Sequence, residues 1–261
     1  MAEELGGKII SEIDGHILKI TISNPKKRNA FDPNMMLQLS NVLTDLDADP
    51  ELWVGVLTAD GEHFTAGLDM PKFFGPNANP VPIPESNVNV FGLGKTCSKP
   101  IVTAMQGICF TIGIEMALAG DVIVAADNCK FCQMEAKRGI APLGGAHFRY
   151  ISRSGWGNAM YHLLLCDEFD AQEAYRVGLV QEVVTTGTQV ERAMEIARTI
   201  AQNAPLGIQA TKAAGRSYIE AGEASAVKAI DDIRDRVMSS QDAEEGIRSF
   251  VERRAAVFTG K

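Results

Sequence analysis

The sequence predicts an α/β protein with a helical C-terminal section. Strand and helix patterns alternate from Ile9 to Val184, and from about Thr188 onward only helical periodicity is found. A mixed order of strands and helices is typical of an α/β core. The length of 261 residues fits one large domain or two unequal ones. We therefore expect an α/β core over residues 1–185 and a helical section over residues 186–261.

The composition is that of a globular protein and excludes several function classes. Hydrophobic residues make up 46% of the chain and charged residues 22%, so general disorder is excluded. With 25 Lys and Arg against 33 Asp and Glu, the net charge is −8. This charge argues against a general binder of nucleic acid or of anionic membranes. No apolar run approaches 18 residues, so no membrane span is expected.

The first elements follow from short-range signals. Apolar residues precede and follow the turn Asp14-Gly15, which predicts a β-hairpin. Asp32 suits the N-cap of a helix and Pro33 its first position. The apolar positions of that helix recur at helical spacing: Met35, Met36, Leu39, Val42, Leu43 and Leu46.

The remaining elements are read from apolar runs and the breakers between them. Buried strands are expected at Trp53–Thr58, Ile101–Met105, Val122–Ala126 and Leu179–Val184, with an extended piece at Lys130–Glu135. Helices are expected from Ile112 to Gly120, over two stretches within His147–Leu165, and at Ala171–Val177. Val190, Ala193, Met194, Ala197, Ile200 and Ala201 share one face of a further helix. The C-terminal apolar positions Ile247, Phe250, Val251 and Phe258 are too many for a free tail.

Residues 71–84 contain five of the eleven prolines. This density predicts neither a helix nor a central strand, because proline lacks the backbone N–H that both need. We expect a long surface loop. Such loops often cover a functional site, and a mobile insertion is the alternative.

The cysteines and the N-terminus suggest a reducing compartment. Residues 1–7 have neither a basic segment nor an apolar segment of the kind that a secretory leader carries. Five cysteines without such a leader are typical of reduced, buried thiols in a cytoplasmic protein. Cys129 and Cys132 form a single C-x-x-C. The alternative to buried thiols is that this pair belongs to a metal or redox site.

Common catalytic motifs are absent or incomplete. Gly94-Lys95-Thr96 could end a phosphate-binding P-loop, but the glycine required five residues earlier is Asn89. Gly92-Leu93-Gly94 lacks the third glycine of a dinucleotide fingerprint, whose place is Cys97. The sequence has no G-x-S-x-G and no H-E-x-x-H. Nucleotide hydrolysis, hydride transfer, serine hydrolysis and zinc chemistry thus lose their usual support.

Two glutamates in apolar surroundings are the best candidates for chemistry. Glu115 lies in the apolar run Ile112–Ala119, where burying a carboxylate is costly without a partner or a task. Helix capping is the alternative, although a capping box begun at Thr111 would need its glutamate at Ile114. Glu135 follows another apolar run, and a solvated turn is its alternative.

Seven segments, in this order, resemble those of the crotonase family, also called the enoyl-CoA hydratase/isomerase superfamily. They are Asn24–Phe31, Phe64–Asp69, Lys99–Gly107, Glu115–Asp121, Glu135, Ala171–Val180 and Phe250–Arg254. The resemblance spans nearly the whole chain. It implies the crotonase-like (ClpP/crotonase) fold, a spiral of β-β-α units followed by a helical C-terminal section for oligomerisation.

The resemblance also implies a reaction. Family members bind acyl-CoA thioesters and stabilise an enolate-like oxyanion with two backbone N–H groups, which correspond to those of Leu68 and Ile112. Hydratases of the family hold one water with two glutamates, and both positions are glutamate here, Glu115 and Glu135. The resemblance therefore implies an enoyl-CoA hydratase, a lyase that adds water to a trans-2-enoyl-CoA.

Binding residues, partners and location are implied in the same way. Arg28, Ala30 and Ala66 correspond to CoA-binding positions, and Phe250 and Arg253 to positions near the adenine that can come from a neighbouring subunit. No metal or redox cofactor is implied, because CoA is part of the substrate. A homotrimer or a dimer of trimers in the cytoplasm is expected, without nucleic acid or membrane partners.

Three departures from the family pattern leave the exact reaction open. Thr111-Ile112 stands where consecutive glycines are usual, Met134 where proline is usual, and Leu143 where another glycine is usual. The alternatives are an enoyl-CoA isomerase or another enolate-forming acyl-CoA enzyme, and a non-catalytic module that binds acyl-CoA or a protein.

Overall fold

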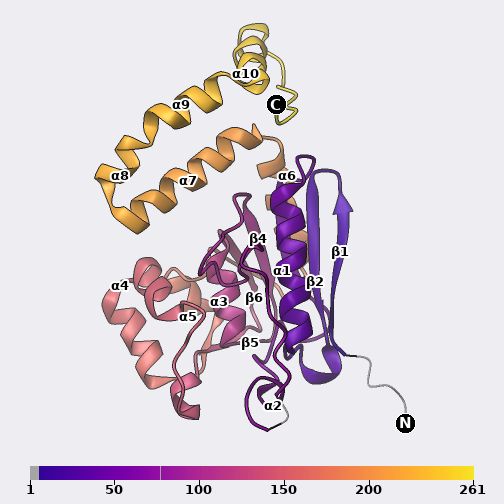
Figure 1. Cartoon of the computed structure of the whole chain (residues 1–261), viewed down its shortest axis with the longest axis vertical. Helices are drawn as coiled ribbons and strands as arrows, with labels where there is room; N and C mark the ends of the chain where they lie inside the picture. The colour runs from indigo at the N-terminus through magenta and orange to yellow at the C-terminus, as the bar shows by residue number, and fades with distance from the viewer. Residues whose placement is uncertain (1–5, 77) are drawn as a thin grey trace.

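The structure is a computed structural model that describes residues 6–76 and 78–261. Most of the N-terminal stretch on which the expectation of no secretory leader rests, residues 1–5, lies outside the described residues. Two sheets organise the body of the molecule (Figure 1).

The larger sheet has six strands in the order β1-β2-β3-β4-β6-β9. Its strands are β1 (Lys8–Asp14), β2 (Ile17–Ser23), β3 (Val54–Ala59), β4 (Ile101–Met105), β6 (Val122–Ala126) and β9 (Glu182–Val184). β1 and β2 form the predicted antiparallel hairpin, and every later pair is parallel. The parallel strands β3 and β4 are buried along their full length, as expected where both faces of a sheet are covered.

The smaller sheet has three strands in the order β5-β7-β8. They are β5 (Ile108–Phe110), β7 (Lys130–Cys132) and β8 (Phe169–Asp170). β5 and β7 are parallel, and β8 is antiparallel to β7. Because α3 (Ile112–Ala119) follows β5 after one residue, this small sheet fixes where α3 begins.

Helices cover both faces of the larger sheet. On one face, α1 (Pro33–Ala48) and α3 contribute Leu39, Leu43 and Leu118 to a core cluster that includes Ile20 and Met105. Asp32 caps α1 as predicted, since its Oδ1 accepts a hydrogen bond of 2.9 Å from the N–H of Met35.

On the other face, α6 (Gln189–Ala201) packs Ala193, Met194 and Ala197 against Val54 and Val102. The predicted apolar face of this helix is therefore confirmed. The division of the chain at residue 185 stays a prediction. α6, the first helix after this boundary, packs directly on the larger sheet.

The last helices extend away from the body of the molecule (Figure 1). They are α7 (Pro205–Ala221), α8 (Glu223–Lys228), α9 (Ile230–Met238) and α10 (Gln241–Glu252). Lys212 ties α7 to the body, because its Nζ donates to Asp121 at 2.6 Å and to the carbonyl of Lys99 at 2.8 Å. After α10 the chain returns to the body, where Phe258 packs against the cluster under α6.

Local details differ from the sequence-based expectation at three places. Residues 70–73 form a one-turn helix, α2 (Met70–Phe73), because Pro71 lies in its first turn, where no N–H is needed. The extended piece after β7 ends early, since Glu135 begins the 3₁₀ turn η2 (Glu135–Arg138). β9 begins only at Glu182. By contrast, the two helical stretches expected within His147–Leu165 are confirmed, because α4 (Ala146–Leu165) is divided at Gly155 (φ 73°, ψ 166°).

The other short elements are η1 (Pro25–Lys27) and α5 (Ala171–Arg176). Within the described ranges, no helix combines the length and the apolar character that crossing a membrane requires. All five cysteines are free and buried, which confirms their interpretation as thiols. Cys129 and Cys132 belong to no group of three or more potential metal ligands among residues 6–76 and 78–261.

Candidate active site

Glu115 is buried at the start of α3 and binds the start of another helix. Its side chain is 2% exposed. Its Oε1 accepts a hydrogen bond of 3.1 Å from the N–H of Ala146, the first residue of α4. Glu115 therefore caps the start of α4 and not that of its own helix, for which the capping alternative is wrong. Negative charge at a helix N-terminus is favourable, which compensates part of the cost of burial.

Glu135 is also buried, with 7% of its side chain exposed. Gln133 Nε2 donates a hydrogen bond of 3.0 Å to its Oε1. Its Oε2 has no hydrogen-bond partner among the described residues. The solvated-turn alternative is therefore wrong, and one carboxylate oxygen is left for a water or a ligand.

Burial shifts the titration of both carboxyl groups. Burial raises the pKa of Glu115, while hydrogen bonds from the N–H groups of Ala146 and Gly144 act in the opposite direction. Burial raises the pKa of Glu135 to about 7, and the nearby charge of Glu115 contributes to the rise. Near neutral pH, Glu135 can therefore both give and take a proton.

Both glutamates line one pocket of about 380 Å³. Leu68 and Ile112 line it beside them. The proline-rich segment forms a wall with Phe73, Phe74, Pro80, Val81 and Ile83. The side chains of this loop therefore line the pocket that holds Glu115 and Glu135, and its role in covering a functional site stays a prediction.

Two backbone N–H groups of pocket residues make no hydrogen bond with any residue that the structure describes. Leu68 forms a bridge with Phe31, in which Phe31 N–H donates to the carbonyl of Gly67 at 2.9 Å and Asp69 N–H to the carbonyl of Phe31 at 2.8 Å. This pattern leaves the N–H of Leu68 without a partner in residues 6–76 and 78–261. The N–H of Ile112, the first residue of α3, likewise donates to none of the residues the structure describes.

A strained residue sets the start of α3. Thr111 has φ 48° and ψ −112°, a conformation that costs on the order of 1–3 kcal/mol for a residue other than glycine. Its N–H donates to the carbonyl of Cys132 at 2.9 Å, which ties α3 to β7. A side chain on Gly67 would approach Thr111 Oγ1 to 2.5 Å, so the loop that carries Leu68 packs tightly against Thr111.

The structure brings together three of the five predicted CoA-binding residues. Ala66 N–H donates to the carbonyl of Arg28 at 2.9 Å, and Ala30 follows two residues after Arg28. Arg28 is exposed beside a cavity of about 390 Å³. Phe250 is 83% exposed on α10, and Arg253 follows that helix. In Figure 1, α10 lies at the opposite end of the molecule from α2 and is not part of the pocket within one chain.

Three contributors to the site carry no clear signal in the sequence. Gln133 binds Glu135, the N–H of Ala146 binds Glu115, and Gly144 leaves room for Glu115. A side chain on Gly144 would collide with the Glu115 carboxylate, whose Cδ would lie 2.7 Å from its Cβ. The one signal that could have indicated Gln133 is its polar side chain within the otherwise apolar run Phe131–Met134.

The chain matches a known family over most of its length. Residues 12–261 match the sequence model of the enoyl-CoA hydratase/isomerase family. An enoyl-CoA hydratase of Mycobacterium tuberculosis is 31% identical over 99% of this chain and 98% of its own. A mevalonyl-coenzyme A hydratase of Aspergillus fumigatus is 32% identical over 95% of this chain and 93% of its own.

Solved structures agree with the sequence comparison. A probable enoyl-CoA hydratase/isomerase from Mycobacterium abscessus superposes with a TM-score of 0.91 at 39% identity, covering 97% of this chain and 99% of that one. An enoyl-CoA hydratase from Bacillus anthracis gives a TM-score of 0.88 at 26% identity, over 97% and 100% of the two chains. The chain therefore has the crotonase fold and belongs to the enoyl-CoA hydratase/isomerase family, as an enzyme of the hydratase-like lyase class.

Proposed function

We propose that the protein adds water to a trans-2-enoyl-CoA and forms a 3-hydroxyacyl-CoA. The observation that carries this proposal is the pair of buried glutamates, Glu115 and Glu135, on one pocket. A pair of carboxyl groups with raised pKa values suits proton transfer to and from a single water. The family's hydratases supply the precedent for this reaction.

The N–H groups of Leu68 and Ile112 bind the thioester oxygen in this proposal. Neither N–H has another partner among the described residues, and both residues line the pocket. The N-terminus of α3 adds a partial positive charge at Ile112. As water adds to the β-carbon, negative charge moves onto the thioester oxygen, where fixed donors stabilise it.

The two glutamates divide the proton transfers. One charged carboxylate removes a proton from the water as the water oxygen bonds to the β-carbon. A carboxyl group in its protonated form then delivers a proton to the α-carbon, and the enolate returns to a thioester. The net change is the addition of one water across the double bond, so no oxidant, metal or further cofactor is required by the proposed reaction.

The CoA part of the substrate binds along the segments that hold Arg28, Ala30 and Ala66. The basic run Lys26–Arg28 on an acidic protein suits the phosphates of CoA. Phe250 and Arg253 reach the adenine from a neighbouring subunit. This is consistent with their exposure and with the position of α10 at the opposite end of the molecule from α2 (Figure 1). The helical section 186–261 then serves oligomerisation into a trimer or a dimer of trimers. The five free cysteines favour a reducing compartment, so we place the protein in the cytoplasm.

The function is tested by adding the protein to a trans-2-enoyl-CoA. We expect loss of the absorbance of the conjugated thioester and a product heavier by one water. A product of unchanged mass would instead identify an isomerase. Binding without turnover would identify a non-catalytic module.

The position of CoA is tested with a truncated substrate. Arg28→Ala should raise KM for the full CoA ester and much less for the pantetheine ester, which lacks the phosphates of the nucleotide part. Equal effects on the two esters would contradict a role for Arg28 in phosphate binding.

A further inference from the structure

Arg149 lies in the first turn of α4 and is half-buried beside the segment that binds Glu115. Its Nη1 donates a hydrogen bond of 3.0 Å to the carbonyl of Gly144, and its Nη2 donates one of 3.3 Å to the carbonyl of Gly92. Its guanidinium also lies 4.9 Å from the centre of the Phe148 ring. Arg149 itself does not line the pocket that holds the two glutamates. Its effect on that pocket must therefore pass through the segments that it binds.

The first of these segments, residues 144–146, holds the carboxylate of Glu115. The N–H of Ala146 donates to Glu115 Oε1 at 3.1 Å, and the N–H of Gly144 donates to the same carboxylate. On its carbonyl side, Gly144 is bound by Arg149. One residue is therefore held by the guanidinium and in turn holds the glutamate.

The second segment carries Phe91, which lines the pocket and precedes Gly92. The two segments also pack on each other, since a side chain on Gly144 would approach Phe91 Cδ1 to 2.9 Å. Space around the guanidinium is limited as well, because a side chain on Gly145 would approach Arg149 Nη1 to 2.7 Å. Arg149 thus links the segment that binds Glu115 to a wall of the pocket.

The charge of Arg149 acts on Glu115 in addition to these contacts. Burial raises the pKa of Glu115, and the positive charge of Arg149 is among the causes that oppose this rise. Burial lowers the pKa of Arg149, and the negative charge of Glu115 opposes that change. The hydrogen bonds of the guanidinium to described residues end on neutral carbonyls, so its charge remains available to Glu115.

We propose that Arg149 is a positioning residue for Glu115, because its guanidinium fixes residues 92 and 144 and thereby aims the N–H groups of Gly144 and Ala146 at the carboxylate. Reacting groups must be held within about 0.5 Å of their productive position, and hydrogen-bonded supports achieve this. The proposal rests on the proposed function for the part that Glu115 plays in the reaction. The alternative is that Arg149 only stabilises the start of α4.

The first test compares two variants of Arg149 in hydration of a trans-2-enoyl-CoA. Arg149→Gln removes the charge and one of the two carbonyl contacts, so kcat should fall by up to about 100-fold with a much smaller effect on KM. Arg149→Lys keeps the charge but lacks the planar fork that reaches two carbonyls, so it should recover only part of kcat.

Arg153→Gln is the matched control, because Arg153 is half-buried on the same helix and its Nη2 donates to the carbonyl of Gly120 at 3.2 Å. The carboxyl group whose charge acts on Arg153 is that of Asp121 and not that of Glu115. This variant should leave kcat unchanged. Equal losses of kcat in Arg149→Gln and Arg153→Gln would contradict a specific role for Arg149.

The second test places Arg149→Gln in a Glu115→Gln background. If Arg149 acts through Glu115, its loss should lower kcat no further once the carboxylate is absent. A structural role at the start of α4 would persist in that background. Losses of kcat that multiply in the double variant would therefore overturn the proposal.

The third test does not require turnover. Infrared titration follows the band of the protonated Glu115 carboxyl group, which Glu115→Gln identifies by removing it. In Arg149→Gln the midpoint of this titration should move to higher pH, because the carboxylate loses a nearby positive charge. Arg153→Gln should not move it. The other ionisable groups whose charges act on Glu115 or Arg149 stay the same in Arg149→Gln: Glu135, His147, Tyr150, Arg153 and Arg216.

The outcomes separate this proposal from the proposed function. A protein that hydrates no enoyl-CoA but shows the shifted titration in Arg149→Gln would retain the positioning of Glu115 and lose the reaction. A protein that hydrates enoyl-CoA, but whose Glu115 titrates at the same pH in Arg149→Gln and the parent, would retain the reaction and overturn the role of Arg149.

Discussion

At the scale of single residues, the site depends on two carboxyl groups that the fold buries on one pocket. The sequence indicated Glu115, because a charged residue within Ile112–Ala119 is conspicuous. It did not indicate Gln133, Gly144 or the N–H of Ala146, because their effect depends on which distant segments meet. Short-range patterns cannot supply that information.

Glu135 predicts a pH dependence of stability. The pKa of Glu135 is raised by burial to about 7 from 4.5. The folded protein therefore binds this proton more tightly than the unfolded chain, so the contribution is fully present below about pH 4.5 and is lost as the pH rises through about 7. Each pKa unit is worth about 1.36 kcal/mol, so the loss can reach about 3 kcal/mol.

Glu135→Gln removes this titration. Urea unfolding of the variant and the parent between pH 4.5 and 8 should show the variant gaining relative stability as the pH rises. The same substitution at the exposed Glu85 is the control and should show no such gain. A difference between Glu135→Gln and the parent that stays constant with pH would contradict the raised pKa.

Gly144→Ala tests the packing around Glu115. The new methyl group would collide with the carboxylate and displace it, and a misplacement of about 1 Å can cost on the order of 100-fold in rate. We expect a lower kcat for hydration with little loss of stability. Gly157→Ala is the matched control, because a side chain there meets no atom within 4 Å. Equal activity of the two variants would show that Glu115 tolerates the displacement.

At the scale of elements, the strands and helices followed from local patterns, and their arrangement did not. The turn Asp14-Gly15 between apolar residues predicted the hairpin of β1 and β2, and Asp32 predicted the start of α1, because both signals act within a few residues. The strand order of the larger sheet depends on which distant strands pair. The one-turn helix α2 was missed, because a proline is compatible with the first turn of a helix.

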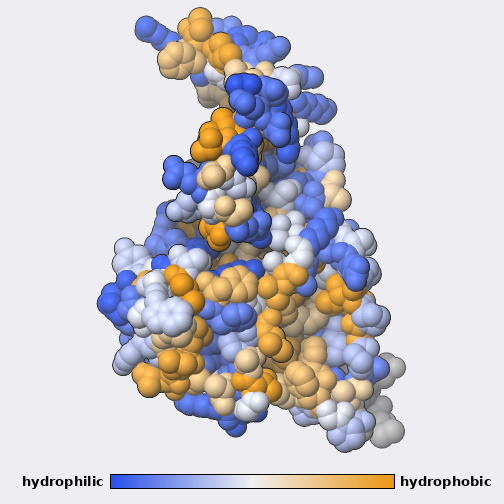
Figure 2. Space-filling view, turned by 60° about the vertical axis from the view of Figure 1, so that its left-hand side comes forward, coloured by the Kyte–Doolittle hydropathy of each residue, from blue (hydrophilic) through white to orange (hydrophobic). Residues whose placement is uncertain are grey.

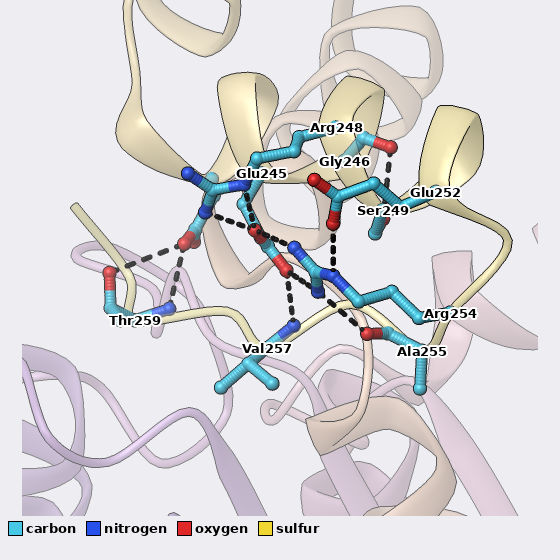
Figure 3. A network of polar contacts seen from close by, with 10 residues as sticks. Glu245, Gly246, Arg248, Ser249, Glu252, Arg254, Ala255, Val257 and Thr259 are labelled. Atoms are coloured by element: carbon cyan, nitrogen blue, oxygen red, sulfur yellow. Dashed lines mark hydrogen bonds and ion pairs between the residues drawn. The ribbon is translucent and has the colours of Figure 1, made fainter.

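The C-terminal tail is held to α10 by a polar network that Figure 3 shows. Glu245 accepts hydrogen bonds from Arg254 Nη2 at 2.8 Å, from Arg248 Nε at 3.1 Å and from the N–H of Val257 at 3.0 Å. The hydrogen bonds from Arg254 are the largest cause that holds the pKa of Glu245 well below its usual range. The same network fixes the position of Arg253, which precedes Arg254.

Glu245→Gln should release the tail without unfolding the body. Amide hydrogen exchange should accelerate over residues 255–259, because the neutral amide binds the two arginines more weakly. Glu244→Gln, an exposed neighbour on α10, should leave the exchange unchanged. Protection that is equal in the two variants would show that the apolar contacts of Phe258 and the hydrogen bonds of Thr259 and Gly260 to Asp242 hold the tail without Glu245.

At the scale of the whole molecule, the helices α7–α10 extend from the body (Figure 1), and several of their apolar side chains are exposed. These include Tyr218, Ile219, Val227, Ile230, Ile247 and Phe250. Figure 2 shows apolar residues on these helices and on the lower part of the body. Exposed apolar surface of this extent is typical of an interface between proteins.

We therefore expect light scattering to give three or six times the chain mass of 28.1 kDa. The C-terminal apolar positions and the family resemblance predict this assembly. The geometry of the interface could not be predicted from one chain, because it depends on contacts between chains. A stable mass of 28.1 kDa at micromolar concentration would contradict it.

The most direct test of the account is a comparison of hydration by Glu115→Gln, Glu135→Gln and the double variant. Glutamine keeps the size of each side chain but cannot exchange the proton. Each single variant should lower kcat about 10²–10⁴-fold with a much smaller effect on KM. Because both glutamates act on one water, the double variant should lose far less than the product of the single losses. Normal hydration by Glu135→Gln with an inactive Glu115→Gln would contradict the two-carboxylate mechanism and favour chemistry with a single glutamate.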